Sequence, residues 1–177
     1  VFNTYSCIRG AEVTERNVLE LIPKAAEAGC ELFIIDAGWQ QNMGDWTIHP
    51  EKFPGGFRKI ISTVRAHGME FGLWVEFERV DSTSRIYREH PEWRVDDAHY
   101  SLLNFARRDV LDYIHGVLRK LLAENDIVYL KMDLNRYLNI PEVENRREMR
   151  TKYMLNFYEL MERLSGEFPD VFFENCA

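Results

Sequence analysis

Acidic side chains follow four short apolar runs of this sequence, and together they could supply carboxylates to one site. The acidic residues in these positions are Asp36, the pair Glu76 and Glu78, Asp133, and Glu174. Several carboxylates gathered at one end of a fold could either bind a metal ion or catalyse glycosyl transfer. Glycosyl transfer requires a pair of them, because a glycosidase uses one carboxylate as nucleophile and another as acid.

The triplet Lys131, Asp133 and Asn135 is the most specific local pattern. Side chains two apart on a strand point the same way, so these three would line one face of a strand end. The Lys131 ammonium would favour the ionised form of Asp133, which a nucleophile at an anomeric carbon requires, and Asn135 can hydrogen-bond sugar hydroxyls. Spacing alone leaves two alternatives open: a structural Lys-Asp pair that caps a strand, and a Schiff-base aldolase that uses Lys131.

A metal site is not expected, because the histidines stand away from the predicted strand ends. Metal-binding barrels usually add histidine ligands at those ends. The histidines of this chain fall in loops or helices: His49, His67, His90, His99 and His115. The sequence therefore predicts no metal.

Strands and helices alternate along the chain. Short apolar runs predict buried strands at residues 2–7, 32–35, 71–75, 102–105, 127–132 and 171–173. Apolar residues at helical spacing predict helices over residues 15–28, 56–65, 109–124 and 148–164. The alternation indicates a parallel α/β sheet, because a crossover between parallel strands needs about a dozen residues, usually a helix.

The acids at the strand ends decide between two α/β architectures. A doubly wound nucleotide-binding fold would show a glycine-rich turn after a strand, and neither GxGxxG nor GxxxxGK[ST] is present. A barrel places its active site at the C-terminal ends of its strands, where these acids stand. We therefore predict a (β/α)8 TIM-type barrel. About six βα units are visible where a closed barrel needs eight, so residues 1–177 are expected to form one incomplete barrel domain.

Composition and charge exclude several classes of partner. With 177 residues, 46% of them hydrophobic, the chain can build one sizeable core. Its 29 acidic and 22 basic residues give a net charge of −7 spread over the whole length, which argues against nucleic acid. No apolar run approaches the roughly 18 residues needed to cross a bilayer, so no membrane span is expected. Three cysteines without a CxxC pair, and an opening VFNTYSCIRG unlike a signal peptide, favour a cytoplasmic protein with reduced thiols.

The segment YLKMDLNR at residues 129–136 resembles the nucleophile motif of family 36 α-galactosidases, K-W-D-x-N-R. Four other segments match this family in the same order: FIIDAGW at 33–39, GDW at 44–46, FGLWVEFE at 71–78 and HPEW at 90–93. The chain is thus similar, over nearly its whole length, to the catalytic region of these enzymes, the melibiases. The resemblance implies hydrolysis of terminal α-D-galactosyl residues with retention, with an α-galactoside oligosaccharide as substrate and no metal or organic cofactor.

The resemblance also implies roles for individual residues. Asp133 matches the family's nucleophile, and the other matching positions imply substrate binding by Asp36, Trp46, Lys131, Asn135, Cys176, Glu76 and Glu78. One of the two glutamates could orient Lys131 or Arg79, with structural pairing as the alternative. Cys176 could instead be a small buried hydrophobic residue. Trp39 and Trp74 could be core aromatics, which is the favoured role for Trp74.

Two departures from the family bear on function. Ala37 replaces the second acid of the family's D-D-G-W motif, so an α-N-acetylgalactosaminidase is an alternative. The chain also ends before the aspartate that serves the family as general acid/base, which implies a fragment that is nearly inert alone and lacks flanking β-rich domains. A sugar-binding or structural barrel remnant is the non-enzymatic alternative. The sequence does not give the oligomeric state; because family members often associate, the resemblance leaves a homo-oligomer open for the full-length protein.

Overall fold

The computed structural model describes residues 1–96, 101–135 and 146–176. Its larger sheet has five parallel strands in the order β1-β2-β3-β7-β8. These strands are β1 (Phe2–Asn3), β2 (Leu32–Ile35), β3 (Glu70–Val75), β7 (Tyr129–Met132) and β8 (Phe172–Asn175). The predicted α/β class and the parallel sheet are confirmed.

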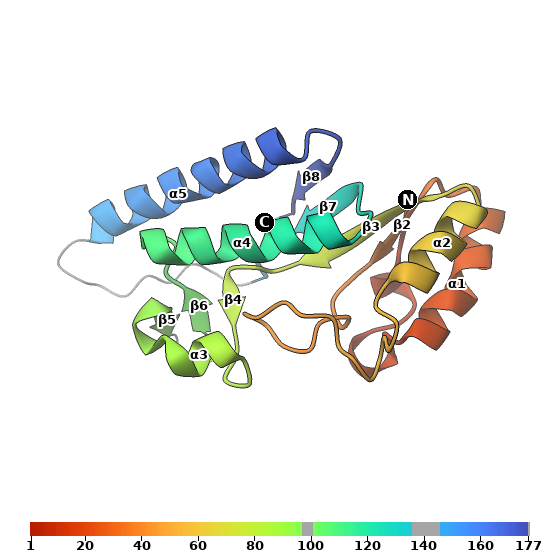
Figure 1. The fold of residues 1–177 in the computed structure, drawn as a ribbon, viewed down its shortest axis with the longest axis horizontal. Helices are drawn as coiled ribbons and strands as arrows, with labels where there is room; N and C mark the ends of the chain where they lie inside the picture. The colour runs from red at the N-terminus through yellow and green to blue at the C-terminus, as the bar shows by residue number, and fades with distance from the viewer. Residues whose placement is uncertain (97–100, 136–145, 177) are drawn as a thin grey trace.

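Four long helices accompany the parallel strands. They are α1 (Glu15–Glu27), α2 (Arg58–Ala66), α4 (Arg108–Glu124) and α5 (Arg146–Glu167). Helix α1 packs against α2, and α4 packs against α5, as the two pairs in Figure 1 show. The four helices predicted from the apolar spacing are therefore confirmed.

Local residue types explain where α1 begins and ends. The Thr14 side chain accepts a hydrogen bond from the Asn17 backbone N–H at 3.3 Å, which satisfies one of the free donors of the first turn. After the helix, Gly29 has φ +75°, a left-handed conformation that glycine adopts without strain. Between these ends the buried residues Val18, Ile22 and Ala25 form one apolar stripe toward the core.

The first strand is shorter than the predicted residues 2–7. The Asn3 side chain accepts a hydrogen bond from the Tyr5 backbone N–H at 2.8 Å and starts the 3-10 turn η1 (Thr4–Ser6). Asparagine favours such local side-chain bonds, which compete with strand pairing. The chain therefore leaves the sheet after Asn3. Two further 3-10 turns are η2 (Gly10–Glu12) and η3 (Pro91–Trp93).

A second, antiparallel sheet is inserted between β3 and α4. It has the order β4-β6-β5, with β4 (Arg79–Val80), β5 (Arg94–Asp96) and β6 (Ser101–Leu103), and the short helix α3 (Arg85–Glu89) precedes β5. Figure 1 shows this sheet and α3 below α4, away from α1 and α2. The run at residues 102–105, counted as a sixth strand of the barrel, belongs here, so the described parallel strands number five. A short apolar run does not reveal its pairing direction, which only its partner strands decide.

The two faces of the parallel sheet differ in their surroundings. One face carries the buried residues Phe33, Ile35 and Leu73, which join the apolar stripes of the helices in one core. On the other face Tyr129 and Phe172 stack with ring centroids 5.2 Å apart, and Phe172 is 62% exposed. Toward the carboxyl ends of the strands, this second face carries polar side chains instead.

Candidate active site

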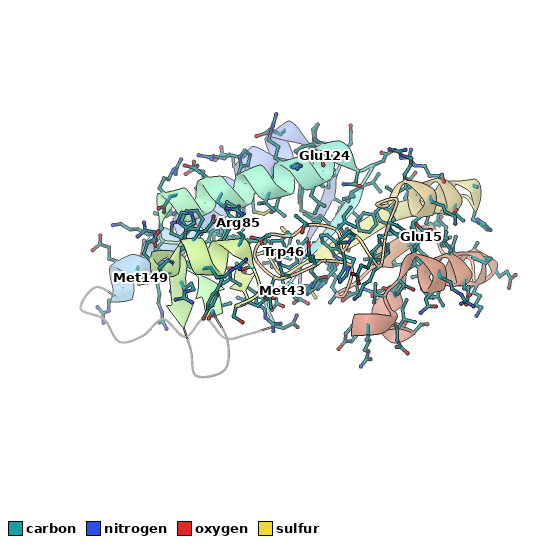
Figure 2. All side chains as sticks on the ribbon, turned by 60° about the horizontal axis from the view of Figure 1, so that its bottom comes forward. Glu15, Met43, Trp46, Arg85, Glu124 and Met149 are labelled. Carbon is teal, nitrogen blue, oxygen red and sulfur yellow. The ribbon has the colours of Figure 1, made fainter. Side chains whose placement is uncertain are left out.

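A cavity of about 620 Å³ lies at the carboxyl ends of the parallel strands. We call it the cleft; its lining residues are Tyr5, Asp36, Ala37, Met43, Trp74, Glu76, Arg79, Lys131, Asp133, Asn135 and Cys176. Met43 reaches it from the loop between β2 and α2, the loop that also carries Trp46 (Figure 2). The cleft therefore brings together all of the predicted site residues except Trp46 and Glu78.

Asp133 follows β7, and two neutral donors hold its carboxylate. The indole Nε1 of Trp74 and the amide Nδ2 of Asn135 each donate to Oδ2 at 3.0 Å. The Asp133 backbone N–H donates to the Val75 carbonyl at 2.9 Å, which continues the pairing of β7 with β3. Within the described ranges no residue donates to Oδ1 of Asp133, and Asp133 lines the cleft.

Asp36 and Lys131 form an ion pair across the sheet. The Lys131 Nζ lies 3.4 Å from Asp36 Oδ2, which also accepts a hydrogen bond from Asn3 Nδ2 at 2.7 Å. Strand β3 lies between the two, and the long lysine side chain spans it. Burial acts to lower the pKa of Lys131, but the Asp36 carboxylate and the other charges of the cleft outweigh it, so the pKa is raised. The ammonium was predicted to neighbour Asp133; the ion pair that the structure describes is with Asp36.

Glu76 lies under the cleft with 1% of its surface exposed. Its Oε1 accepts the Asn135 backbone N–H at 2.8 Å, and its Oε2 lies 3.5 Å from Arg79 Nη1. Burial raises the pKa of Glu76, while the hydrogen bond from Asn135 and the charge of Arg79 oppose the rise. Of the two partners predicted for a glutamate here, Glu76 pairs with Arg79. Because the Asn135 side chain donates to Asp133, Glu76 also helps to position that donor.

Glu78 does not line the cleft, although it was predicted to bind substrate. Its carboxylate accepts a hydrogen bond from the Tyr153 hydroxyl of α5, and the residue is 6% exposed. The reason is that β3 ends at Val75. Beyond it the Arg79 N–H donates to the Glu76 carbonyl at 2.9 Å, and this turn replaces the two-residue alternation of a strand. Burial raises the pKa of Glu78 to about 7, and the hydrogen bond from Tyr153 opposes this rise only in part.

Replacing Glu78 by glutamine should remove a pH dependence of stability. The carboxyl has a pKa of about 7 when folded against an ordinary value of 4.5, so the folded state binds more protons between these values. The free energy of unfolding therefore falls as pH rises from 4.5 to 7, by about 3 kcal/mol for a shift of this size. Urea titrations across this range should show the native chain losing about that much relative to Glu78→Gln. Glu148→Gln, at an exposed ion pair of α5, should follow the native chain; identical pH slopes in native and Glu78→Gln would refute the prediction.

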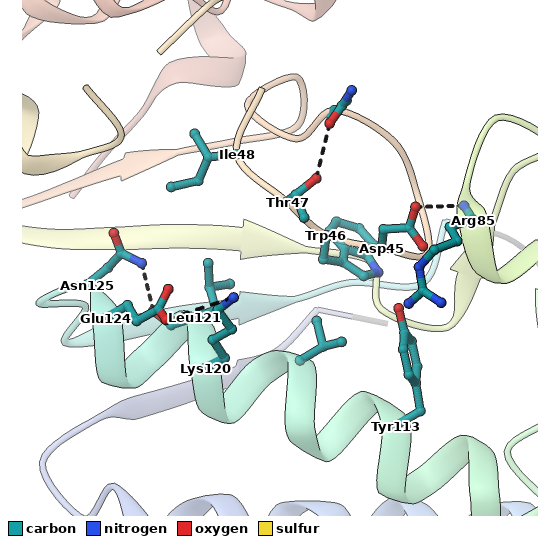
Figure 3. Close-up of a pocket in the computed structure, with 12 residues that line it drawn as sticks. Asp45, Trp46, Thr47, Ile48, Arg85, Tyr113, Lys120, Leu121, Glu124 and Asn125 are labelled. Carbon is teal, nitrogen blue, oxygen red and sulfur yellow. Dashed lines mark hydrogen bonds and ion pairs between the residues drawn. The ribbon is translucent and has the colours of Figure 1, made fainter. Parts of the chain in front are cut away.

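Trp46 lies behind the cleft rather than in it. It is 3% exposed and lines a separate cavity of about 580 Å³ between its own loop and α4 (Figure 3). Asp45 of the same loop accepts the Arg85 backbone N–H at 2.7 Å, which ties the loop to α3. The ring centroid of Trp46 is 6.1 Å from that of Trp39 and 6.1 Å from that of Trp74. Among the described residues that line the cleft, Trp74 is the one whose ring packs on Trp46.

Trp74 lies in the cleft, although a core role was favoured for it. It is 2% exposed, yet its indole N–H reaches Asp133. Its backbone carbonyl accepts the Trp39 Nε1–H at 2.8 Å, so a fully buried second tryptophan holds it from behind. Trp74 stands opposite Lys131 in the parallel register, which puts both side chains on one face of the sheet. Knowledge of this strand register would have been enough to assign Trp74 to the site.

The end of β8 contributes one residue to the cleft. Cys176 lines it and is exposed, so the alternative of a buried hydrophobic residue is wrong. Glu174, expected among the gathered carboxylates, instead accepts a hydrogen bond from the Tyr129 hydroxyl at 2.8 Å and does not line the cleft. Tyr5 and Met43 do line it, and no feature of the sequence pattern pointed to them.

The described part of the chain holds neither a metal-binding group of side chains nor a helix that could span a membrane. Across residues 1–96, 101–135 and 146–176, no three His, Cys, Asp or Glu side chains are grouped so that they could hold a metal ion. In the same ranges no helix is both long and apolar enough to cross a membrane.

The loop that follows Asp36 depends on a glycine at position 38. Gly38 has φ +120°, and a Cβ there would lie 2.8 Å from the Gly10 carbonyl oxygen and 2.9 Å from Val13 Cγ2. We expect Gly38→Ala to lower the free energy of unfolding by about 2–3 kcal/mol, because the backbone is strained and the methyl group clashes. Gly116→Ala in α4, where a Cβ meets open space, should be neutral or stabilising by up to about 1 kcal/mol. Denaturant unfolding of both variants checks this, and equal midpoints would contradict it.

A family model described as melibiase matches residues 2–177. The chain belongs to the melibiase family. Its curated relatives include α-galactosidase AgaA of Geobacillus stearothermophilus, 33% identical over an alignment that covers 94% of this chain, and an α-galactosidase of Escherichia coli, 34% identical over 90%. These alignments cover 26% and 25% of the two relatives, so the chain spans about a quarter of their length. The resemblance inferred from the five ordered segments is confirmed.

Solved structures of GH36 α-galactosidases share the fold. A variant of AgaA from G. stearothermophilus in complex with raffinose gives a TM-score of 0.86 at 30% identity, covering 98% of this chain and 27% of that one. The galactosidase domain of the α-galactosidase-sucrose kinase AgaSK gives a TM-score of 0.86 at 28% identity, covering 99% and 26%. The arrangement of helices and strands described above is therefore that of the family.

Proposed function

We propose that this chain carries the nucleophile and sugar-binding side chains of a retaining α-galactosidase, which hydrolyses terminal non-reducing α-D-galactosyl residues of oligosaccharides or glycoconjugates. The observation that carries the proposal is the setting of Asp133. Its carboxylate lies in a cleft of about 620 Å³, where Trp74 and Asn135 hold Oδ2 and no other described residue donates to Oδ1. Family membership and the α-galactosidase names of the relatives support the same activity.

In the proposed mechanism Asp133 Oδ1 attacks the anomeric carbon of the galactosyl residue. The bond to the leaving oxygen breaks as an acid from another part of the enzyme protonates that oxygen, and a covalent galactosyl-enzyme forms. The conjugate base of the same acid then deprotonates a water, which releases galactose with its α configuration retained. Trp74 and Asn135 hold Oδ2 throughout, so the attacking oxygen keeps its orientation.

The remaining cleft residues bind the sugar in this proposal. Asp36 accepts hydrogen bonds from hydroxyl groups and Lys131 donates to hydroxyl oxygens, while their ion pair keeps both in place. Trp74 provides an apolar wall for the sugar ring, and Cys176, which directly follows β8, also lines the cleft. Two predicted binding residues are buried and act through a neighbour. Glu76 accepts the Asn135 backbone N–H, and the ring of Trp46 packs on that of Trp74.

The described sheet is proposed to be part of a (β/α)8 barrel, the catalytic domain of a longer enzyme. Among the described strands β1 and β8 each pair with one neighbour, and the sheet face with Phe172 is open. Eight parallel strands close a barrel and bury such a face. The relatives are about four times as long as the matched region, which leaves room for further strands and for flanking β-rich domains. A cytoplasmic location stays a prediction from the sequence, and a homo-oligomer stays open on the family resemblance alone.

An α-N-acetylgalactosaminidase is the second candidate, because Ala37 lines the cleft. A small apolar side chain there offers no acceptor for a hydroxyl and leaves space for an acetamido group. Hydrolysis of an aryl α-galactoside and of an aryl α-N-acetylgalactosaminide by the complete enzyme separates the two. Faster turnover of the galactoside supports the proposal, and faster turnover of the acetamido sugar supports the second candidate. Binding of galactose without turnover of either would leave a sugar-binding protein.

A further inference from the structure

Glu78 is a buried carboxyl group without a described cationic partner. It is 6% exposed, and no lysine or arginine of the described residues lies within ion-pair distance of it. Among the described residues, the titratable groups that face it are Tyr153 from α5 and Glu76 from the same turn. Burying a carboxyl group in this way is costly, so packing alone does not account for it.

Residue 78 is anchored to two elements that are distant in sequence. Its side chain accepts the Tyr153 hydroxyl of α5, and its backbone carbonyl accepts the Leu103 N–H of β6 at 2.7 Å. The Tyr153 ring packs on Phe105, with centroids 5.6 Å apart, and Asn156 of α5 donates to the Phe105 carbonyl at 2.6 Å. The segment after β3 is thus pinned between α5 and the small antiparallel sheet.

The pinned segment leads directly to the cleft. The turn in which the Arg79 N–H donates to the Glu76 carbonyl at 2.9 Å also carries the Glu76 side chain. Glu76 Oε1 accepts the Asn135 N–H at 2.8 Å, and Asn135 Nδ2 donates to Asp133 Oδ2 at 3.0 Å. A shift of the turn would therefore move Glu76 and Asn135, and with them the carboxylate of Asp133.

We infer that Glu78 is a positioning residue for the cleft: bonded to Tyr153, it holds the turn at residues 76–79, from which Glu76 keeps Asn135 against Asp133. The inference rests on the proposed function, in which Asp133 is the nucleophile. Burial raises the pKa of Glu78 to about 7, so the neutral form predominates below that pH. At higher pH its ionisation places a negative charge in apolar surroundings beside Glu76. The desolvation cost and the repulsion from Glu76 exceed what the carboxylate gains in its bond from Tyr153, so the turn becomes less stable. The cleft is therefore best ordered while Glu78 keeps its proton.

The test compares the pH profiles of kcat and KM for an aryl α-galactoside with the complete enzyme. Glu78→Gln keeps an acceptor for Tyr153 and cannot ionise, so kcat should stay within about twofold of native at about pH 6 and fall less than native above about pH 7. Glu78→Ala removes the acceptor and should lose about tenfold or more in kcat at both pH values, with a smaller change in KM. Glu148→Gln, an exposed acid of α5, should match the native profile.

Tyr153→Phe supplies an independent variant that keeps the ring in the core. Without the hydroxyl that stabilises the carboxylate, the pKa of Glu78 should rise, and the fall of kcat that its ionisation causes should move to higher pH. The kcat itself should be lower than native, because the bond that holds the turn is lost. Superimposable profiles for native, Glu78→Gln and Tyr153→Phe would overturn the inference and leave the proposed function standing. Equal losses in Glu78→Gln and Glu78→Ala at every pH would also overturn it. An enzyme that does not hydrolyse the aryl α-galactoside at all would instead remove the proposed function, and the inference with it.

Discussion

Hydrolysis of an aryl α-galactoside by the complete enzyme is expected to fall by about 10,000-fold or more when Asp133 is replaced by alanine. Losses of this size follow removal of a nucleophile, because no other group forms the covalent intermediate. The space left beside Trp74 and Asn135 should admit a small external anion. Azide should therefore restore turnover and yield the β-galactosyl azide, since a single displacement inverts the anomeric centre. Initial rates and the anomeric proton coupling of the product give the two measurements.

Glu174 provides the matched control for this experiment. It is also an acid at the end of a parallel strand, but its carboxylate accepts the Tyr129 hydroxyl and does not line the cleft. Glu174→Gln keeps an acceptor for that hydroxyl and should change kcat by less than about tenfold. A loss in Glu174→Gln as large as that in Asp133→Ala, or an α-configured azide product, would exclude Asp133 as the nucleophile.

Replacing Lys131 by methionine is the second change with a large expected effect. The variant leaves Asp36, whose side chain is 6% exposed, without the ammonium at 3.4 Å, and it removes a donor to the sugar. Loss of one partner of a buried ion pair costs about 3–5 kcal/mol. The expected result is a decrease of about 100- to 1,000-fold in kcat/KM. Steady-state kinetics check this, and the Asp36→Asn, Lys131→Met double variant separates the unpaired charge from the lost donor.

Lys120→Met is the control for the loss of a lysine. The Lys120 ammonium lies 3.9 Å from Glu124 on the surface of α4, and its side chain is 72% exposed. Exposed pairs of this kind contribute little, so kcat/KM should stay within about twofold of native. If Lys131→Met were as active as Lys120→Met, activity would depend neither on a hydrogen bond from Lys131 to the sugar nor on its ion pair with Asp36. If the double variant lost no more than Lys131→Met alone, Asp36 and Lys131 would act as one unit.

Periodicity was sufficient to predict most of the parallel sheet and its helices. The run at 32–35 is a strand with those limits, and the helix over 15–28 is observed at Glu15–Glu27. Both predictions succeeded because a buried parallel strand is apolar throughout, and a helix that covers it is apolar on one stripe. The run at 102–105 did form a strand, but its antiparallel pairing with β4 and β5 was not predictable. A run of three or four apolar residues carries no information about its neighbours.

The cleft could be predicted in part for a similar reason. Side chains two apart on a strand share a face, and the carboxyl ends of parallel strands meet at one edge. These two rules place Asp36, Lys131 and Asp133 together, as the structure shows. The same rule failed for Glu78, because the chain turns after Val75 and the alternation stops there.

Local pattern and family motifs alone specified the α/β class and the acids that meet at the strand ends. Tertiary structure alone decided which aromatic side chain enters the cleft and which ion pair forms inside it. Trp74 and Trp46 are both nearly buried, and only the register of β3 with β7 puts Trp74 beside Asp133. Hydrophobic spacing records which face of an element is buried, whereas partners from distant segments depend on how strands align and turn in three dimensions.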